Sequence, residues 1–478
     1  MSPGLSIALA LLLLVGCAVP PAHDSLKSAV LPPLIPVRDF VANTDSQSHY
    51  RVSPDGTKVA WKAVHGTQEE IFVRTLGKDD ARNLGFDAQG YPFYWAQDSR
   101  RLLFVKDAGG NENFHLFVVD TDELEPSPLD ITPGENTRVV LQRMIKGDPS
   151  NVLIAHNGRD RAVFDLYRLN LDTGEQTPVY ENSGDVIKLV TDRRGRLRAR
   201  VRQSETQRFL ELPPADGQGW SVILSWTKDD EVQPLQFTAE GDAIWMVSNR
   251  GRDKKALVRL DVKTAEESVV YAHPEADIGR VHISALSETP VLVHAQPDYP
   301  HVEVLDAALR PVLASLRMDG PVGVHISSSD SSEQLITFDV KTDLGVEYFL
   351  YDRGSGDKIH LGQSASYAFA DALSPMRPIQ FHARDGLLLR GYLTVPQGIA
   401  GKPVPMVMLV HGGPFARDFW GYSALVQFLA NRGYAVLQVN YRGSSGYGRT
   451  FMEAAIGEFA GTMHDDLIDG VSWAVEQG

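Results

Sequence analysis

Near its carboxy-terminal end the chain reads Pro405-Met406-Val407-Met408-Leu409-Val410-His411-Gly412-Gly413-Pro414. The first six of these residues form a continuous apolar run, which predicts a strand buried on both faces. A helical pattern follows over 423–431 and stops at Gly433, and a second buried strand is expected over 434–439. A second helix is expected over 465–476. Strand, helix, strand and helix in this order indicate a parallel sheet with crossover connections.

The region that precedes this motif changes pattern at Pro375-Met376-Arg377-Pro378. Two strands are expected over 379–382 and 387–395, around the turn Arg384-Asp385-Gly386. We therefore place the start of the carboxy-terminal α/β domain close to residue 366.

Further towards the amino terminus, a turn flanked by strand-like runs recurs seven times. Ser53-Pro54-Asp55-Gly56 and Gln97-Asp98-Ser99-Arg100 are the clearest copies. The acidic residues of the turns stand 42 to 50 residues apart, at positions 55, 98, 148, 192, 240, 288 and 330. This period is typical of one four-stranded blade, so we expect a seven-bladed β-propeller. The turns at 192, 240 and 288 are weak, and six or eight blades remain compatible with the pattern.

A second marker follows several of these turns. Leu116-Phe117-Val118-Val119-Asp120 and Leu257-Val258-Arg259-Leu260-Asp261 alternate in hydrophobicity and end in a turn residue. We interpret them as the outer strands that close their blades. Glu69-Glu70, also in this region, has two interpretations: a site for a peptide amino terminus, or a solvated strand edge.

The amino terminus has the pattern of an export signal. Ser6 to Val15 is apolar but shorter than a membrane span, and Gly16-Cys17 follows it. Leu14-Val15-Gly16-Cys17 is similar to a bacterial lipobox, although Met1 to Leu5 lacks the usual Lys or Arg. We expect a signal peptide over 1–17, lipidation at Cys17, and a Pro-rich and Ala-rich tether over 18–37. The alternative is an ordinary secretion signal with an incidental cysteine.

Composition excludes several classes of function. The 478 residues carry a net charge of −15, which argues against a nucleic-acid partner. Cys17 is the single cysteine, so no disulfide within the chain is expected. The sequence has no His-Glu-x-x-His, no paired cysteines and no Gly-x-x-x-x-Gly-Lys, so neither a metal nor a cofactor is expected.

The glycines at 412 and 413 have a mechanical interpretation. In an α/β-hydrolase, a glycine-rich loop after an early strand supplies one backbone N–H of the oxyanion hole. Residues without side chains let the backbone approach a tetrahedral intermediate. A tight turn without catalytic meaning would also explain His411-Gly412-Gly413-Pro414, and the downstream motifs decide between the two.

Those motifs are His411 to Asp418, Trp420-Gly421-Tyr422, Gln427 to Tyr434, Asn440 to Gly448 and Asp465-Asp466-Leu467. Together they resemble the prolyl oligopeptidase family, and most of all its acylaminoacyl-peptidase and dipeptidyl-peptidase-like members. The resemblance implies a propeller followed by an α/β-hydrolase domain, with peptides as substrates. It also implies that Gly413 supplies the first oxyanion N–H within a loop formed by His411, Gly412 and Pro414. Other members carry a tyrosine where His411 stands.

The family's nucleophile lies in a Gly-x-Ser-x-Gly elbow, and the 478 residues contain no such pattern. Gly421-Tyr422-Ser423, Gly362-Gln363-Ser364 and Gly443-Ser444-Ser445 all lack the second glycine. The hydrolase domain is therefore expected to be incomplete before its nucleophile elbow, with Ser, Asp and His all beyond Gly478. We interpret His411 and His464 as structural, and Arg442 with Asp465-Asp466 as an internal ion pair.

We thus expect a propeller over 38–365 and an incomplete α/β-hydrolase domain over 366–478. The full-length form would be a serine peptidase that hydrolyses short peptides through an acyl-enzyme, while the 478-residue chain would be inactive. It would be exported across the inner membrane to the periplasm or cell envelope and held at the membrane by its lipid anchor. The alternative is a non-catalytic envelope lipoprotein whose propeller binds partners.

Overall fold

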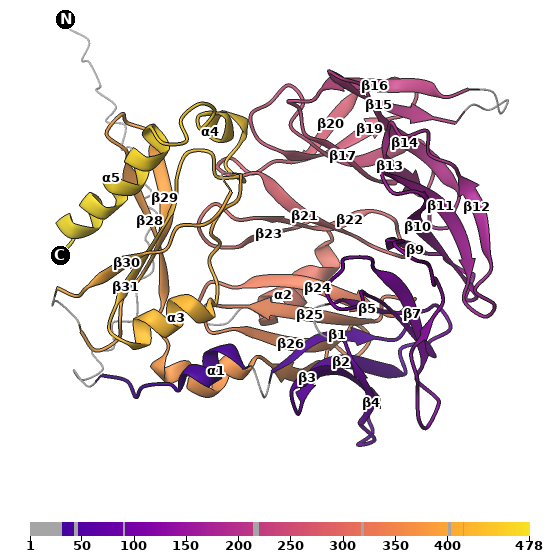
Figure 1. Ribbon diagram of the computed structural model, residues 1–478, viewed down its shortest axis with the longest axis horizontal. Helices are drawn as coiled ribbons and strands as arrows, with labels where there is room; N and C mark the ends of the chain where they lie inside the picture. Colours follow the sequence, from indigo (N-terminus) through magenta and orange to yellow (C-terminus); the bar gives the residue numbers. More distant parts are fainter. Residues whose placement is uncertain are drawn as a thin grey trace, which may run out of the picture.

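The computed structural model describes residues 31–42, 46–88, 91–213, 219–316, 320–399, 403–413 and 415–478. The expected signal peptide, Cys17, residues 18–30 of the expected tether, and Pro414 lie outside this part. Figure 1 shows a large assembly of sheets on one side and a smaller α/β part, which ends in helix α5, on the other.

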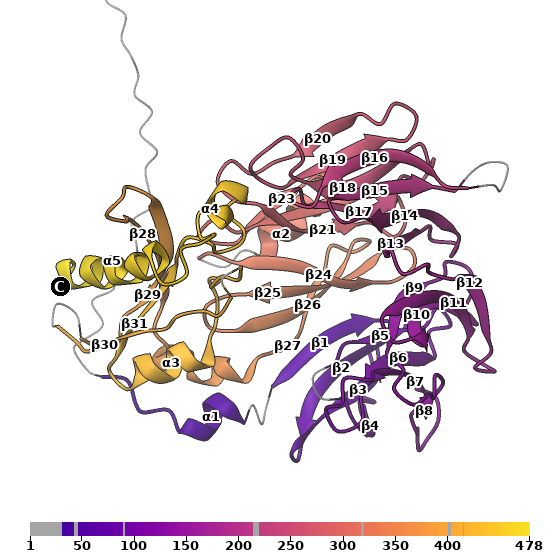
Figure 2. The ribbon, with the colours of Figure 1, turned by 45° about the horizontal axis from the view of Figure 1, so that its top comes forward.

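Seven antiparallel sheets follow one another along the chain, and each is a meander of consecutive strands (Figures 1 and 2). Consecutive meanders arranged in this way form a β-propeller. The first four sheets contain β1 (Gln47–Val52), β2 (Lys58–His65), β3 (Gln68–Thr75) and β4 (Arg82–Asp87); β5 (Phe93–Trp95), β6 (Arg101–Lys106), β7 (His115–Asp120) and β8 (Leu129–Asp130); β9 (Val139–Met144), β10 (Asn151–Asp160), β11 (Val163–Asn170) and β12 (Gln176–Tyr180); β13 (Val186–Thr191), β14 (Leu197–Gln203), β15 (Gln207–Leu212) and β16 (Ser221–Thr227).

The last three propeller sheets contain β17 (Val232–Phe237), β18 (Ala243–Ser248), β19 (Ala256–Asp261) and β20 (Glu267–Tyr271); β21 (Ile278–Ile283), β22 (Pro290–Ala295) and β23 (His301–Val304); β24 (Gly323–Ser329), β25 (Leu335–Lys341), β26 (Val346–Asp352) and β27 (Lys358–Gln363). A 3-10 helix (Ala307–Leu309) and helix α2 (Arg310–Leu316) follow the three-stranded sheet. Another 3-10 helix (Ala365–Ala372) connects the last sheet to the α/β part.

The recurring turns are where the repeat predicts them. Each of the seven positions, from 55 to 330, falls between the first and second strands of its own sheet. The expectation that 116–120 and 257–261 are outer strands is wrong. They belong to β7 and β19, the third strands, and the chain turns after each one to add a fourth strand, β8 or β20. The third strands β7 and β19 are largely buried, whereas the fourth strands β8 and β20 contain no buried residue, so the hydrophobic signal ends one strand before the blade does.

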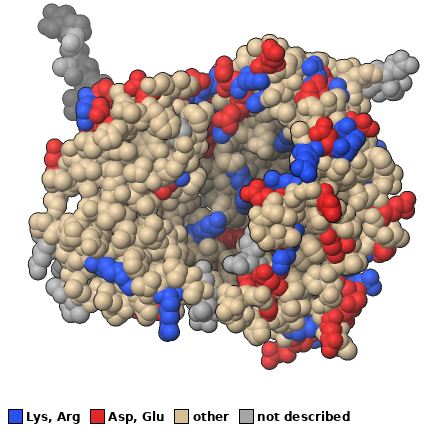
Figure 3. All heavy atoms as spheres, viewed as in Figure 1, with Lys and Arg blue, Asp and Glu red and all other residues tan. Residues whose placement is uncertain are grey.

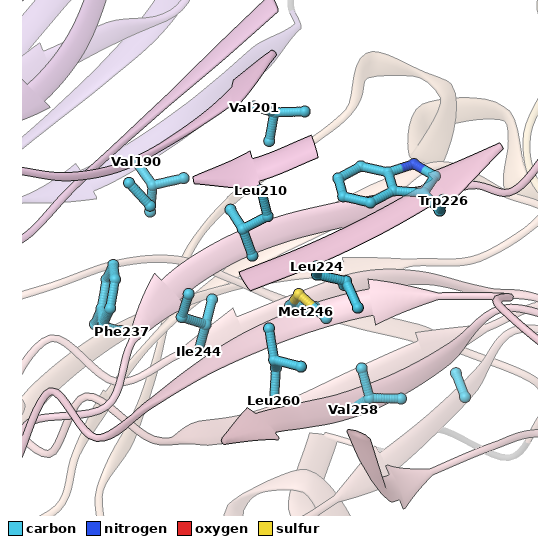
Figure 4. Packing of buried hydrophobic residues seen from close by; sticks show 12 residues of the cluster. Val190, Val201, Leu210, Leu224, Trp226, Phe237, Ile244, Met246, Val258 and Leu260 are labelled. Atoms are coloured by element: carbon cyan, nitrogen blue, oxygen red, sulfur yellow. The ribbon is translucent and has the colours of Figure 1, made fainter. Parts of the chain in front are cut away.

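Adjacent sheets are held together by apolar side chains. One cluster, drawn in Figure 4, combines Leu210 and Trp226 of the fourth sheet with Ile244, Met246 and Leu260 of the fifth. All five side chains are buried. Packing of this kind between successive sheets explains why the alternating pattern repeats with each blade.

The ring closes between its first and last sheets without a shared strand, because β1 pairs only with β2 among the described strands. Hydrogen bonds between neighbouring inner strands join them instead. Arg51 Nη1 donates to Ser327 O at 3.1 Å, and Val52 N donates to Ser328 Oγ at 2.8 Å. Since β1 meets β24 and β5 on its two sides, the first strand of each sheet is the innermost.

The α/β part has one mixed sheet in the order β28-β29-β31-β30. Its strands are β28 (Met376–His382), β29 (Leu388–Thr394), β30 (Met406–Met408) and β31 (Ala435–Asn440). Its helices are α3 (Ala424–Asn431), α4 (Arg449–Glu453) and α5 (Thr462–Glu476). β30 and β31 are parallel, and α3 forms their crossover, as expected. β31 is buried along its whole length, but the expectation of full burial for 405–410 is wrong: β30 is a half-buried edge strand with β31 as its only described neighbour.

Helix α1 (Val37–Val41) and the residues before it pack against α3 and the connecting 3-10 helix, and Leu344 between β25 and β26 joins the same apolar cluster. Phe40 meets Phe428 edge to face at 5.8 Å between ring centroids, and Ile35 N donates to Asn431 Oδ1 at 2.9 Å. Residues 31–37, which the sequence assigns to a tether, and 38–41, assigned to the propeller, thus contact the α/β part because Ile35 and Phe40 need an apolar partner. In the described part of the chain, no helix has the length and apolar character needed to cross a membrane.

Candidate active site

The glycine-rich loop that follows β30 lies beside the loop that follows β31. Carboxyl ends of neighbouring parallel strands share one edge of a sheet, where open α/β sheets bind ligands. Leu409 N extends the pairing by donating to Leu437 O at 2.9 Å, and Ser445 N donates to Ala416 O at 3.0 Å. The structure therefore brings together two motifs that are about thirty residues apart in the sequence.

His411 is fixed by the second of these loops. Its ring stacks on Tyr441 with 4.4 Å between centroids, and Tyr441 Oη donates to His411 O at 3.0 Å. His411 Nε2 lies 3.1 Å from Ser444 Oγ, which itself donates to Tyr441 O at 2.6 Å. His411 Nδ1 lies 3.0 Å from Gly412 O, so both ring nitrogens face oxygen atoms of the site. These contacts give His411 a positioning role in the loop.

Ser444 and His411 resemble the nucleophile and base of a hydrolase, but their chemistry does not fit. Ser444 is fully buried, and its hydroxyl proton points to a backbone carbonyl. An attacking hydroxyl has to face the substrate and give its proton to the base. Two of the three Gly-x-Ser serines considered above are structural as well: Ser423 caps the amino end of α3, and Ser364 Oγ accepts from Val346 N at 2.9 Å.

Gly413 has the backbone conformation that a glycine permits. Its φ is +147°, and a Cβ at this position would lie 2.8 Å from Phe415 N and 3.0 Å from Ala416 N. Gly412 and Gly413 are exposed, and no described residue accepts a hydrogen bond from the Gly413 N–H. An exposed N–H of this kind can bind an oxyanion. The role that the resemblance gives to Gly413 stays a prediction, and Pro414 lies outside the described residues.

A buried polar network underlies the loop, and sequence reasoning did not assign it a role. Asp418 N donates to Asn440 Oδ1 at 2.8 Å, and Asn440 Nδ2 donates to Tyr447 Oη at 2.8 Å. Arg417 Nη2 donates to the same Tyr447 oxygen at 2.6 Å. Burial raises the pKa of Tyr447, so the phenol stays neutral. Burial also raises the pKa of Asp418, while the charge of His411 lowers it by a smaller amount.

The propeller holds this network from the other side. Arg417 Nη1 donates to Gln296 O at 2.9 Å, in the loop between β22 and β23. Asp298 in that loop accepts from Arg390 Nη1 at 2.8 Å and from Gln380 Nε2 at 2.7 Å. The candidate oxyanion loop therefore lies at the junction of the two parts. Sequence patterns do not indicate Arg417, because two of its acceptors, Gln296 O and Pro297 O, are backbone carbonyls 121 and 120 residues away.

The expected ion pair exists, with one correction. Arg442 binds fully buried Asp466 through Nε at 2.9 Å and Nη2 at 2.7 Å, as predicted. Asp465 does not join this pair. It points to the other side of α5 and meets Arg384 at 3.1 Å, because adjacent residues on a helix face different directions.

The two remaining candidates lie apart from the loop. His464 is exposed in the first turn of α5, and no described residue hydrogen-bonds to its ring. Glu69 and Glu70 are engaged within the first sheet: Glu69 Oε2 lies 3.1 Å from Lys62 Nζ, and the buried Glu70 accepts from Asn83 and lies 3.1 Å from His65 Nδ1. Within the described ranges, no group of three or more His, Cys, Asp or Glu side chains could hold a metal ion.

Comparisons with known proteins agree with this geometry. A profile described as prolyl oligopeptidase family matches residues 420–478. The chain is 32% identical to dipeptidyl aminopeptidase BIII of Pseudoxanthomonas mexicana, over 99% of the chain and 70% of that protein. It is 25% identical to dipeptidyl peptidase family member 6 of Caenorhabditis elegans, over 92% of the chain and 65% of that protein.

Solved structures show the same fold at lower identity. A puromycin-hydrolyzing peptidase of Mycobacterium tuberculosis matches with a TM-score of 0.68 and 16% identity, over 94% of this chain and 74% of the other. The ring of meanders, the glycine-rich loop at the end of β30, and the extended similarity to dipeptidyl aminopeptidase BIII lead to one conclusion: the chain belongs to the prolyl oligopeptidase family of serine peptidases.

Proposed function

We propose that this protein, in its full-length form, is a serine-type peptidase that hydrolyses short peptides through an acyl-enzyme. One observation carries the proposal: the exposed Gly413 N–H has no described acceptor, at the carboxyl edge of two parallel strands and beside the propeller. A backbone donor in this position can stabilise the oxyanion of a tetrahedral intermediate, which is usually a large part of catalysis in acyl transfer.

The 478 residues contain no Gly-x-Ser-x-Gly elbow, and the chain spans 70% of dipeptidyl aminopeptidase BIII. We propose that the nucleophile, its acid and its base belong to sequence that follows Gly478 in the full-length form. The 478-residue chain would then retain the oxyanion loop but catalyse no acyl transfer, because it has no nucleophile to form the acyl-enzyme.

The propeller supports a restriction to short peptides. It contacts the α/β part through Arg417 and Asp298, so a substrate has to reach Gly413 at the junction of the two parts. The names of the relatives suggest removal of dipeptides or of acylated residues. A panel of chromogenic dipeptidyl, acylaminoacyl and internally cleaved substrates separates these specificities.

The test compares two proteins: the 478-residue chain and the product of the gene with its downstream coding sequence. Both are treated with a fluorophosphonate probe and with the substrate panel. We expect serine labelling and hydrolysis only in the longer product. Labelling of the shorter chain would refute its proposed inactivity. A stop codon directly after Gly478, or a longer product without labelling, would favour the non-catalytic envelope lipoprotein whose propeller binds partners.

We further propose that the protein is exported across the inner membrane and held at the envelope by lipid on Cys17. The sequence Leu14-Val15-Gly16-Cys17 after an apolar run supports this proposal. One acyl chain binds a membrane only marginally, so stable attachment needs the several chains that bacterial lipoproteins carry.

A further inference from the structure

Arg417 is a buried cation that joins the candidate oxyanion loop to the propeller. It follows Gly413 closely in the sequence, and it is only 8% exposed. Its Nη1 donates to Gln296 O at 2.9 Å and its Nη2 donates to Pro297 O at 3.4 Å, both in the loop between β22 and β23. One side chain thus crosses the junction between the two parts of the molecule.

The same guanidinium also binds the α/β part. Nη2 donates to Tyr447 Oη at 2.6 Å, and Nε donates to Asp418 O at 3.1 Å. Arg417 Cζ lies 4.2 Å from the Tyr447 ring centroid and 4.7 Å from that of Phe419. All four acceptors of Arg417 are neutral oxygens in different directions, which the planar fork of an arginine can reach together and the single ammonium of a lysine cannot.

The loop after β31 is held beside this guanidinium. Gly446 lies so close to it that a Cβ at this position would be 2.8 Å from Arg417 Nη1. The propeller fixes Gly446 as well, because Asp277 N donates to Gly446 O at 2.9 Å. Arg417 and Gly446 are therefore held against the propeller together.

Two further hydrogen bonds extend this support to the oxyanion loop. Ser445 N donates to Ala416 O at 3.0 Å, and Asp418 N donates to Asn440 Oδ1 at 2.8 Å. The residues on both sides of Arg417 are thus fixed. The Gly413 N–H has no described acceptor of its own, so the direction of this donor depends on how the segment that follows it is held.

Contacts of this local kind align the two parts. Figure 3 shows a deep hollow in the middle of the molecule, so the α/β part and the propeller are not packed against each other over their full width. On the propeller side, Asp298 fixes the loop that receives Arg417 by accepting from Arg390 Nη1 at 2.8 Å and from Gln380 Nε2 at 2.7 Å. A displacement of that loop would move the carbonyls that hold Arg417.

We propose that Arg417 is a positioning residue, which uses the propeller to hold the Gly413 N–H in the direction that an oxyanion requires. The inference rests on the proposed peptidase function, because only acyl transfer gives that donor its task. It adds to that function a role for the propeller in the chemical step, besides restricting access. The expected effect is large, since a misplacement of about 1 Å at a reacting centre can cost about 10²-fold in rate.

The first test is hydrogen exchange in the 478-residue chain, which requires no activity. In Arg417→Gln, the amides of Asp418 and Ser445 should exchange at least about tenfold faster than in the parent, because the segment between the two loops opens locally more often. Both amides are hydrogen-bonded in the parent, so a loss of protection can be measured.

The matched control is Arg432→Gln. Arg432 likewise donates to a backbone carbonyl, Ile35 O at 2.6 Å, and its Cζ lies 4.3 Å from the Phe428 ring centroid. It holds the segment before α1 against α3 and does not contact the oxyanion loop. The exchange of the Asp418 and Ser445 amides should therefore be the same in this control as in the parent.

The second test is kinetic and uses the longer product with a neutral peptide anilide. Arg417→Gln should lower kcat about 10- to 100-fold and leave KM within about twofold, because the oxyanion donor acts on the transition state and not on the bound substrate. Arg417→Lys keeps the charge but not the planar fork, so it should lose most of the same kcat. Arg432→Gln should keep both constants, which separates positioning from a general loss of stability.

Asp298→Ala tests whether the effect passes through the propeller. This change removes the acceptor of Arg390 and Gln380 but leaves Arg417 in place, so it should lower kcat by a smaller factor than Arg417→Gln. The double variant should be only slightly slower than Arg417→Gln alone, because both changes release the same contact.

An Arg417→Gln variant with the kcat of the parent, or with a raised KM at unchanged kcat, would overturn the inference. Equal acceleration of exchange in Arg432→Gln would also overturn it. Losses that multiply in the double variant would show two independent effects and would remove the propeller from the chemical step. Failure of the proposed function is distinguishable: the parent longer product would then neither react with the fluorophosphonate probe nor hydrolyse the peptide, while the exchange test would still decide whether Arg417 holds the loop.

Discussion

The buried ion pair between Arg442 and Asp466 provides a quantitative test of the α/β part. Asp466 is fully buried and accepts three hydrogen bonds from Arg442: from N at 2.9 Å, from Nε at 2.9 Å and from Nη2 at 2.7 Å. Asp466→Ala removes all three. It leaves a buried guanidinium and a buried backbone N–H without their acceptor.

Breaking a buried pair by removing one partner costs about 3–5 kcal/mol in free energy of unfolding. Arg442 keeps a second carboxylate, Asp385, at 2.8 Å, but the Asp385 side chain is 44% exposed and screened by water. We therefore expect Asp466→Ala to cost about 3 kcal/mol, the lower end of that range.

Equilibrium urea unfolding measures this loss, and hydrogen exchange of peptides from β31 and α5 locates it in the α/β part. The matched control is the neighbouring Asp465→Ala, which removes only the 3.1 Å contact between two exposed side chains, Asp465 and Arg384. The control should leave the urea midpoint unchanged. The double change Asp466→Leu with Arg442→Met should be more stable than Asp466→Ala, since no charge is left buried.

Equal midpoints for Asp466→Ala and Asp465→Ala would refute this reasoning. A loss of protection in the propeller but not in β31 would also refute it, because the pair joins only elements of the α/β part.

Three further predictions concern the oxyanion loop, the histidines and the anchor. Gly413→Ala in the longer product should lower kcat by about 10²–10³. The reason is that the new Cβ would meet Phe415 N at 2.8 Å and displace the Gly413 N–H that donates to the oxyanion. An unchanged kcat on a neutral peptide would exclude Gly413 as an oxyanion donor. His325 has its pKa lowered from 6.5 to about 3, so the unfolded chain takes up a proton first and stability should fall as pH drops from about 6.5 towards about 3. His325→Phe should flatten this slope in urea midpoints measured at several pH values, and a slope as steep as that of the parent would contradict the assignment. Cys17→Ser should move the protein from the membrane to the soluble fraction, and a protein that stays membrane-bound would contradict lipidation at Cys17.

Local patterns determined much of the fold. The seven turn positions each fall between the first and second strands of a sheet, and α3, β31 and α5 lie where periodicity predicts them. Such features depend on residues within one turn or one strand, so alternation, capping and turn chemistry are enough to find them. The ion pair between Arg442 and Asp466 was also predictable. Arg442 follows the end of the buried strand β31 and Asp466 lies on α5, and both elements belong to the α/β part.

Other features depend on which surfaces meet, and only the tertiary structure decided them. The third strands β7 and β19 looked like outer strands because the fourth strands β8 and β20 contain no buried residue and therefore carry no hydrophobic pattern. Asp465 and Asp466 are adjacent in sequence, and the phase of α5 sends them to different partners. Arg417 is held by carbonyls of the propeller, and Arg51 meets Ser327 only because the ring closes. Contacts between residues hundreds of positions apart leave no periodic signal, since their energy comes from burial and charge at surfaces that exist only after folding.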